Sequence, residues 1–413
     1  MASSEITLEA VPSAADVPAE EWNTCANPQL HSVAGNRRHE QPHAATSWVE
    51  TKPFYNPFVS HAFFSALEAS GSATPRTGWA ARHLVARIDG RIAGIVPCYL
   101  KSHSQGEYVF DRGWADAYAR AGGRYYPKLQ VSVPFTPATG PRLLIRDGVD
   151  REQIASALAS GLIALTGISK ASSAHVTFAP EQEWKLLARH GFLQRTDQQF
   201  HWHNQGFARF EDFLAALNSR HRKAIKRERR EAVQNGISIH WLNGSDITED
   251  AWSAFFDFYM ETGSRKWGRP YLTRSFFSLI SESMAKDVLL VMARRSHRWI
   301  AGAINFIGSE TLFGRHWGAI EHHPMLHFEI CYYQAIEFAI KHHLKTVEAG
   351  AQGEHKIARG YLPQTTFSAH YIADSGLRRA ISDYLKRERV YVAAAGHELA
   401  EAAPFRKAAD EAP

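Results

Sequence analysis

Apolar and polar residues alternate with a period of two along residues 83–100, and the alternation breaks at Asp89 and Gly90. This period places alternate side chains on opposite faces of a strand, and an Asp-Gly pair is a strong signal for a tight hairpin turn. The pattern therefore predicts two antiparallel strands joined at Asp89. Apolar residues at helical spacing between Pro57 and Gly71 predict a helix before the hairpin.

The same order of elements recurs in the second half of the chain. Residues 288–306 again alternate, and Ala301-Gly302 corresponds to Ala93-Gly94 of the first hairpin. A helix precedes each hairpin, and a helix followed by a strand comes after it; the following helices are expected at residues 153–165 and 326–343, and the strands at residues 175–178 and 346–349. A repeat at this separation indicates a duplicated domain, and 413 residues suit two domains. The sequence therefore predicts two tandem domains with mixed α/β sheets.

The domain boundaries are expected in polar, turn-rich segments. A join is expected between Arg195 and Phe210, where Asn204 and Gly206 supply turn residues. The expected parts are an N-terminal domain over residues 1–203, with a polar loop or insertion at 26–53, a C-terminal domain over 204–395, and a flexible tail over 396–413.

Composition narrows the class of protein. Hydrophobic residues make up 45% of the chain and aromatic residues 12%, as in an ordinary folded protein. No apolar run approaches the roughly 18 residues that span a bilayer, and no basic residue precedes an apolar core at the N-terminus. The three cysteines lie far apart without CxxC spacing, which argues against disulfides or a cysteine zinc site. We therefore expect a cytoplasmic protein.

The positive charge is concentrated in one segment. Residues 220–231 carry seven Lys or Arg and two Glu, a net +5 that equals the formal charge of the whole chain. A helix is predicted over residues 210–234, with Leu214, Leu217 and Ile225 on the face that packs. Its other face carries a basic stripe, Arg220, Lys223, Lys226, Arg227 and Arg230. Such a stripe suits a polyphosphate, a nucleic-acid backbone or an anionic cell-wall precursor, although exposed charged faces are common on ordinary helices.

Several stretches resemble proteins of the FemAB-like family. In the second half, residues 217–228, 235–239, 252–262 and 267–268 are similar to the start of the second GNAT domain in that family, and residues 318–319, 328–340 and 347–363 to its end. In the first half, residues 56–63, 99–111, 114–118, 125–129 and 133–142 resemble a bacterial FemAB-like branch labelled as peptidoglycan biosynthesis or recognition. The resemblance extends over residues 56–371.

The resemblance implies a fold and a reaction. It implies two tandem GNAT-like (acyl-CoA N-acyltransferase) domains and a transferase that joins an activated acyl or aminoacyl group to an amine, in some members an amine of a peptidoglycan precursor. FemAB enzymes proper use aminoacyl-tRNA, and other GNAT proteins use acyl-CoA. The glycine-rich loop that receives acyl-CoA in GNAT domains is absent from residues 321–328, which contain no glycine. The sequence therefore leaves the donor open between acyl-CoA and aminoacyl-tRNA, and we expect no resident cofactor.

Acyl transfer to an amine needs a proton acceptor and donors for the carbonyl oxygen as it becomes an oxyanion. Residues 350–361 follow a predicted strand and contain Gln352, Glu354, His355, Lys356 and Arg359. We predict the site here, with Glu354 or His355 as proton acceptor and Lys356 as a third catalytic residue. Lys356 and Arg359 are expected to meet phosphate or carboxylate, and Gln352 to bind substrate. The alternative is a solvated turn with surface charges.

Other residues are weaker candidates for substrate binding. Arg315 and Trp317 lie on the predicted strand before the one that leads into this segment. They are expected to line the same cleft, or else to belong to the core. In the first half, Lys101, Trp114 and Asp116 form either a recognition loop or an ordered structural loop. No metal site is expected, because the histidine pairs at 322–323 and 342–343 lack further ligands at suitable spacing.

Two other functions remain compatible with the sequence. One is a non-catalytic protein that kept the GNAT fold for binding, and the other is a protein that binds RNA through the basic stripe. The amine acceptor, a small molecule or a cell-wall precursor, the involvement of tRNA and the oligomeric state are left open.

Overall fold

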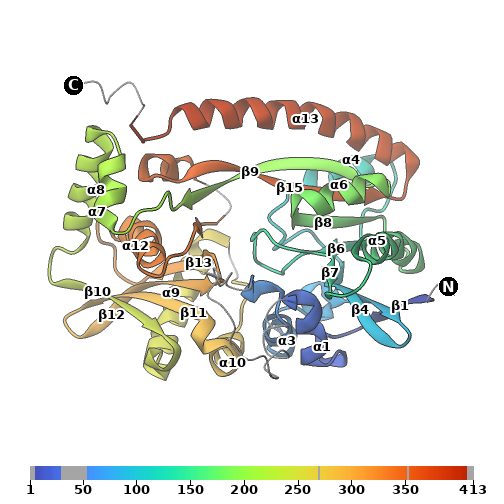
Figure 1. The fold of residues 1–413 in the computed structure, drawn as a ribbon, viewed down its shortest axis with the longest axis horizontal. Helices are drawn as coiled ribbons and strands as arrows, with labels where there is room; N and C mark the ends of the chain where they lie inside the picture. The colour runs from blue at the N-terminus through green and yellow to red at the C-terminus, as the bar shows by residue number, and fades with distance from the viewer. Residues whose placement is uncertain (1–4, 29–53, 268–269, 351–352, 407–413) are drawn as a thin grey trace, which may run out of the picture.

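The computed structural model describes residues 5–28, 54–267, 270–350 and 353–406 (Figure 1). Within these residues the strands form a sheet of four strands, in the order β1-β3-β4-β7, and a sheet of eleven. The order in the larger sheet is β10-β11-β12-β13-β14-β9-β15-β8-β6-β5-β2. The smaller sheet consists of β1 Ile6–Val11, β3 His83–Ile88, β4 Arg91–Val96 and β7 Leu144–Ile145.

Both predicted hairpins are confirmed. β3 and β4 pair antiparallel across Asp89 and Gly90, which both have positive φ, 49° and 79°. In the second half, β11 Val288–Arg295 pairs with β12 Arg298–Ile307 across Ser296 and His297, with φ of 47° and 65°. Two successive residues of positive φ match the right-handed twist of the flanking strands, so the turn sequence sets the register of each hairpin.

Each half continues with a parallel pair of strands joined through a helix. In the first half β6 Lys128–Val131 runs parallel to β8 Ser173–Ala179, with α5 Arg151–Ile168 between them in sequence. In the second half β13 Thr311–Ala319 runs parallel to β14 Thr346–Glu348, and a helical segment of residues 326–341 connects them. The expected duplication into two tandem GNAT-like domains of mixed α/β structure is confirmed by this topology.

The two halves are joined through one continuous sheet. β9 Leu193–His203 pairs with β14, and β15 Leu362–Ile372 lies between β9 and β8 of the first half. The remaining strands of the large sheet are β2 Trp79–Ala81, β5 Cys98–Lys101 and β10 Ile237–Asn243. A late segment of the chain therefore completes the sheet of the first half. The boundaries themselves stay a prediction.

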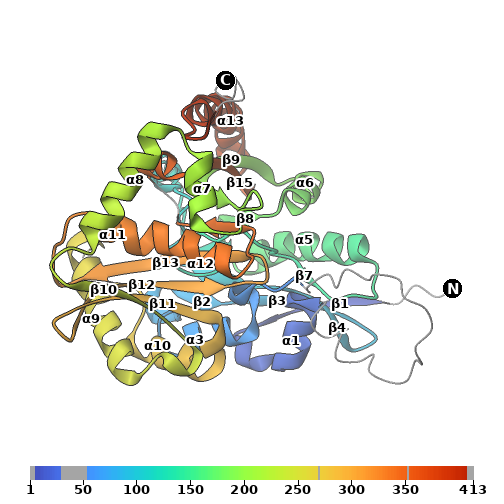
Figure 2. The same ribbon diagram turned by 60° about the vertical axis from the view of Figure 1, so that its left-hand side comes forward.

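Helices cover both faces of the sheet (Figures 1 and 2). In the second half α12 Gln334–Lys341 packs on one face, and α9 Glu249–Trp267 packs on the other beside α10 Arg274–Met284. The helices of the first half are α1 Ala19–Ala26, α3 His61–Ala69, α4 Arg112–Arg120, α5 and α6 Glu181–Arg189. The long helix α13 Ser375–Glu401 lies along β9 and β15. No helix in the described residues is apolar over a length that would cross a membrane.

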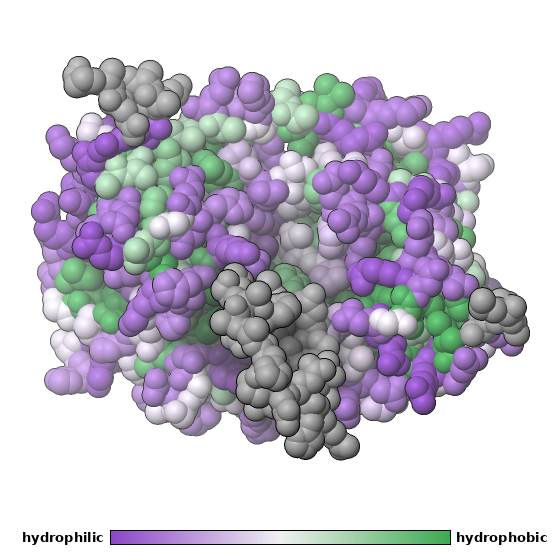
Figure 3. Space-filling model, viewed as in Figure 1, coloured by the Kyte–Doolittle hydropathy of each residue, from purple (hydrophilic) through white to green (hydrophobic). Residues whose placement is uncertain are grey.

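One apolar core is shared by the two halves. The ring of Phe58, from the first half, lies 4.9 Å from that of Phe306 and 5.1 Å from that of Phe313, both from the second half. All three side chains are buried, and each buried aromatic side chain contributes about 1.5–3 kcal/mol. On the face shown in Figure 3, hydrophilic surface predominates and the apolar patches are small.

The predicted helix over residues 210–234 is wrong in one respect, because it is two helices. α7 Phe210–Ala216 ends where Leu217 becomes extended and forms a bridge to Phe405. α8 Ser219–Ala232 then begins at Asn218, whose Oδ1 accepts the backbone N–H of His221. An Asn side chain that caps a new helix competes with continuation of the old one.

The termini and the loop differ in part from expectation. α13 continues through Glu401, so residues 396–401 of the expected tail are helical. The expected loop at 26–53 begins as α1 ends at Ala26. Its residues 29–53 lie outside the described residues, as do residues 407–413 of the tail.

Candidate functional site

The parallel strands β13 and β14 part from each other within the sheet. They pair at Thr311, Leu312 and Phe313, and the last pair joins Phe313 to Glu348. Beyond it the strands diverge around a cavity of about 90 Å³. Its lining consists of Ala303, Asn305, Gly314, Arg315, His316, Trp317, His327, Cys331, Tyr332 and Ala349. We call this cavity the opening.

An unusual helical turn borders the opening. The segment between β13 and β14 starts as α11 Leu326–Phe328, widens into a π-turn at Glu329–Tyr333 and continues as α12. A π-turn inserts one residue into a helix and is frequent at functional sites. Here it brings Cys331 and Tyr332 to the lining of the opening.

Lys356, from the predicted segment, lies close to the end of β14. It belongs to a 3₁₀ helix, Glu354–Arg359, and its side chain is buried. Its Nζ donates to the carbonyl oxygens of Ala349, at 2.7 Å, and of Gly350, at 3.0 Å. Burial, together with the charge of Arg315, lowers the pKa of the Lys356 amine to about 8. This lysine is therefore held beside the opening with a proton that it can lose near neutral pH.

The other residues of the predicted segment have different environments. Glu354 and His355 are exposed, and Nε2 of His355 lies 3.0 Å from the hydroxyl of Tyr332. Arg359 is buried, its guanidinium forms a bidentate ion pair with Glu228, and Nη1 donates to the carbonyl of His355 at 2.7 Å. Arg359 thus holds the segment in place with donors that are already engaged. Gln352 lies outside the described residues.

Arg315 and Trp317 both line the opening, on β13. Nε of Arg315 is buried and finds no hydrogen-bond partner within the described part of the chain. An unpaired buried donor costs about 1–3 kcal/mol, so this nitrogen is available to a ligand. The ring of Trp317 lies 5.2 Å from that of His327 at the other side of the opening.

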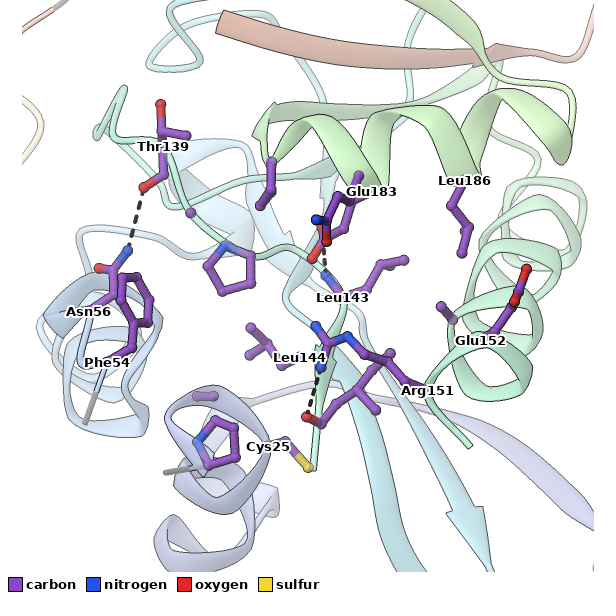
Figure 4. Close-up of a pocket in the computed structure, with 18 of the residues that line it drawn as sticks. Cys25, Phe54, Asn56, Thr139, Leu143, Leu144, Arg151, Glu152, Glu183 and Leu186 are labelled. Carbon is purple, nitrogen blue, oxygen red and sulfur yellow. Dashed lines mark hydrogen bonds between the residues drawn. The ribbon is translucent and has the colours of Figure 1, made fainter. Parts of the chain in front are cut away.

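A larger cavity, of about 760 Å³, lies between the two halves (Figure 4). We call it the interdomain cavity. Its wall includes α5, α6 and residues 139–145 of the first half, and Thr311, Phe313 and Glu348 of the second. Glu348 is therefore on the wall of this cavity and directly precedes Ala349 of the opening.

Comparison with known families agrees with this arrangement. A family model named FemAB-like and described as peptidoglycan biosynthesis/recognition matches residues 13–407. The chain belongs to the FemAB-like family. With its two GNAT-like domains, the FemAB-like protein is a transferase of acyl or aminoacyl groups to an amine, as the resemblance implied.

Several solved structures are similar to the FemAB-like protein at low identity. FemX shares 12% identity over 76% of this chain and 93% of its own, with a TM-score of 0.48. A tandem GNAT protein from the clavulanic acid biosynthesis pathway shares 13% over 90% and 99%, with a TM-score of 0.45. The L-PGS structure from Bacillus licheniformis shares 7% over 81% and 99%, with a TM-score of 0.49. No curated protein matches the chain.

In the first half of the FemAB-like protein, Lys101 and Trp114 are buried, whereas Asp116 is exposed on α4. Asp116 does not share a face of α4 with Trp114, because residues two positions apart in a helix point in different directions. Lys101 lies instead with the buried carboxylate of Glu107, 3.8 Å away, and over the ring of Trp79. Burial lowers the pKa of Lys101 to about 7. Its role in substrate binding stays a prediction.

The basic stripe of the FemAB-like protein is exposed on α8, as expected. None of its five side chains forms an ion pair with a carboxylate of the described residues. The opposite side of α8 faces the site, since Glu228 contacts Arg359 and Tyr333, and Arg229 contacts the π-turn at Glu329, 3.0 Å away. The basic stripe is thus on the outer face of α8, and the inner face of α8 contacts the 3₁₀ helix and the π-turn beside the opening.

Sequence patterns alone missed two carboxylates of the site. Glu348 interrupts an apolar strand, and that interruption was the available signal. Glu183 stands among other charged residues of α6 and gave no signal of its own. The absence of a metal site stays a prediction; in the described ranges no group of three or more His, Cys, Asp or Glu side chains is arranged to hold a metal ion.

Proposed function

We propose that the FemAB-like protein forms its amide at the opening between β13 and β14, with Lys356 as the group that stabilises the developing oxyanion. The observation that carries this proposal is the buried amine of Lys356, held by the carbonyls of Ala349 and Gly350 where β14 ends. A positively charged donor in a site sheltered from water stabilises an oxyanion far more than the same donor does in solution.

The donor is an acyl thioester or an aminoacyl ester, and the acceptor is an amine of a peptidoglycan precursor or of a smaller molecule. The amine nitrogen attacks the donor carbonyl, and the carbonyl oxygen takes up negative charge beside Lys356. Collapse of the intermediate releases the thiol or hydroxyl of the donor, and the nitrogen loses its remaining extra proton. The lowered pKa of Lys356 fits this role, because a group that donates a proton or a hydrogen bond in catalysis is most effective when its pKa lies near the working pH.

The pH dependence of amide formation tests this role. Purified protein is incubated with acyl-CoA or aminoacyl-tRNA mixtures and amine acceptors, and the amide is measured by mass spectrometry. The rate should fall as the pH rises through about 8, because Lys356 then loses the proton that it donates. Lys356→Arg should move this fall to higher pH, since a guanidinium stays charged. Absence of any amide with both donors would favour a non-catalytic binding protein.

The basic stripe supports a polyanionic donor, which both acyl-CoA and aminoacyl-tRNA are. Replacing Arg220, Lys223 and Arg227 by Glu should raise KM for the donor by about tenfold or more and weaken its salt dependence. Replacing the exposed Arg379, Lys386 and Arg387 of α13 is the matched control for net charge. An unchanged KM would exclude the stripe from donor binding.

The same variant tests the remaining alternative. A protein that acts through RNA binding alone should bind RNA with steep salt dependence, lose this binding in the stripe variant and form no amide. Aminoacyl-tRNA as donor predicts the same loss of RNA binding together with a loss of transfer.

A further inference from the structure

The interdomain cavity has an apolar wall with carboxylates from both halves of the molecule. Leu143, Leu144, Leu186 and Phe313 contribute apolar surface. Glu183 lies on α6 at the wall (Figure 4), where it is partly exposed. Glu348 of β14 is only 6% exposed. A carboxylate placed against apolar surface lacks the solvation it has in water, and a cation restores that stabilisation.

Neither carboxylate has a cation of its own. No Lys, Arg or His nitrogen of the described residues lies within ion-pair distance of Glu183 or Glu348. Oε2 of Glu183 accepts the backbone N–H groups of Arg142, at 2.9 Å, and of Leu143, at 3.2 Å. Oε2 of Glu348 accepts a long bond, 3.4 Å, from the N–H of Thr139. Among the described residues, no hydrogen bond is made to the second oxygen of either carboxylate, which is the atom we assign to a ligand.

Two arginines near the cavity, Arg142 and Arg189, are engaged with other groups. Arg142 is buried and donates to the carbonyls of Ala138, Gly140 and Thr177, at 2.6 to 2.9 Å. On the wall of the cavity Arg189 pairs with Glu152, 3.2 Å away. The charged groups that face Glu348 are Arg142 and Arg315, and those that face Glu183 are Arg142 and Arg151. Their positive charges partly offset the rise that burial causes in the pKa of the two carboxyl groups, but they form no ion pairs with them.

The cavity is next to the place of reaction. Glu348 is the last residue of β14 that pairs with β13, and the following residue, Ala349, lines the opening and accepts a hydrogen bond from Lys356. A group held at Glu348 is therefore one residue along the backbone from Ala349, whose carbonyl accepts a hydrogen bond from the amine of Lys356.

We propose that the interdomain cavity binds the acceptor as an ammonium group on an apolar stem, with Glu348 as the proton acceptor and Glu183 as a second carboxylate that favours the cation. This proposal rests on the proposed function. Glu348 removes one proton from the ammonium group, and the free amine attacks the donor carbonyl. The new C–N bond replaces the C–S or C–O bond of the thioester or ester. The leaving sulfur or oxygen takes a proton, and the proton on Glu348 passes to solvent.

Binding without a donor provides the test. Binding of n-hexylamine and of 1-hexanol to the full-length protein is measured by calorimetry, because the two differ only in the charged group. The amine should bind about tenfold or more tightly than the alcohol, and E348Q and E183Q should each remove most of this preference. Burial raises the pKa of both carboxyl groups to about 7, so binding of the amine should strengthen from about pH 6 to about pH 8.

The controls separate this inference from the proposed function. Lys356→Met should leave hexylamine binding within about twofold of the wild type while it lowers the transfer rate by about 10²- to 10³-fold, because it removes a group that acts on the acyl donor and not on the amine. E183Q keeps an oxygen for the N–H groups of Arg142 and Leu143, and a thermal melt of the variant checks that it folds. Equal binding of amine and alcohol, no binding of either, or a preference that survives both Gln variants would overturn the inference. None of these results would affect a transfer activity that depends on Lys356.

Discussion

Lys356→Met should lower the rate of amide formation by about 10²- to 10³-fold, which is the usual loss when one oxyanion donor is removed. Met has a similar length and fits the buried position, but it offers no hydrogen to the developing oxyanion. The reaction would then have to place negative charge in a sheltered site with no positively charged donor beside it. Single-turnover kinetics with saturating donor measure this step without the contribution of product release.

Lys345→Met is the matched control. Lys345 is exposed and pairs with Glu310 at the start of β14, so the same substitution there removes a charge without touching the opening. We expect its rate to stay within about twofold of the wild type, since exposed ion pairs contribute little. If Lys356→Met also stays within a few-fold while the protein remains folded, Lys356 does not stabilise the oxyanion.

Gly318→Ala should destabilise the protein by about 3 kcal/mol or more. A Cβ atom built on Gly318 would lie 2.0 Å from the carbonyl oxygen of Phe258 and 2.2 Å from its carbon. These are main-chain atoms of α9, so neither a rotamer change nor a small side-chain shift can relieve the contact. Since β13 forms one wall of the opening, the helix and the strand can separate only by distorting the site. Chemical denaturation measures the loss of stability.

Gly167→Ala serves as the comparison. A Cβ atom there meets no atom within 4 Å, and Gly167 lies in α5 with an ordinary helical backbone. This substitution should be neutral or should stabilise by up to about 1 kcal/mol, because Ala restricts the unfolded chain more than Gly does. A wild-type midpoint for Gly318→Ala would show that α9 does not pack against β13 as closely as described.

The candidate site was predictable where its residues are consecutive. Residues 350–361 are unusually polar for the end of a strand, and Lys356 does lie beside the opening. The residues that line the opening from elsewhere were only partly predictable. Arg315 and Trp317 share a strand with this site, but Tyr332 reaches it through a π-turn, which no local sequence pattern indicated. Asp116 is exposed on α4, and its position relative to Lys101 depends on how α4 packs, which no local pattern indicated.

Local patterns along the chain were sufficient for the hairpins, the duplication, the exposed basic stripe and the position of Lys356. Turn formation and side-chain periodicity depend on residues close together in sequence, so they can be predicted without the rest of the fold. The break between α7 and α8, the insertion of β15 beside β8 and the union of Glu183 with Glu348 in one cavity depend on contacts between distant residues. Those contacts form because burial of apolar surface brings the two halves together around a shared core, and its energy outweighs local preferences.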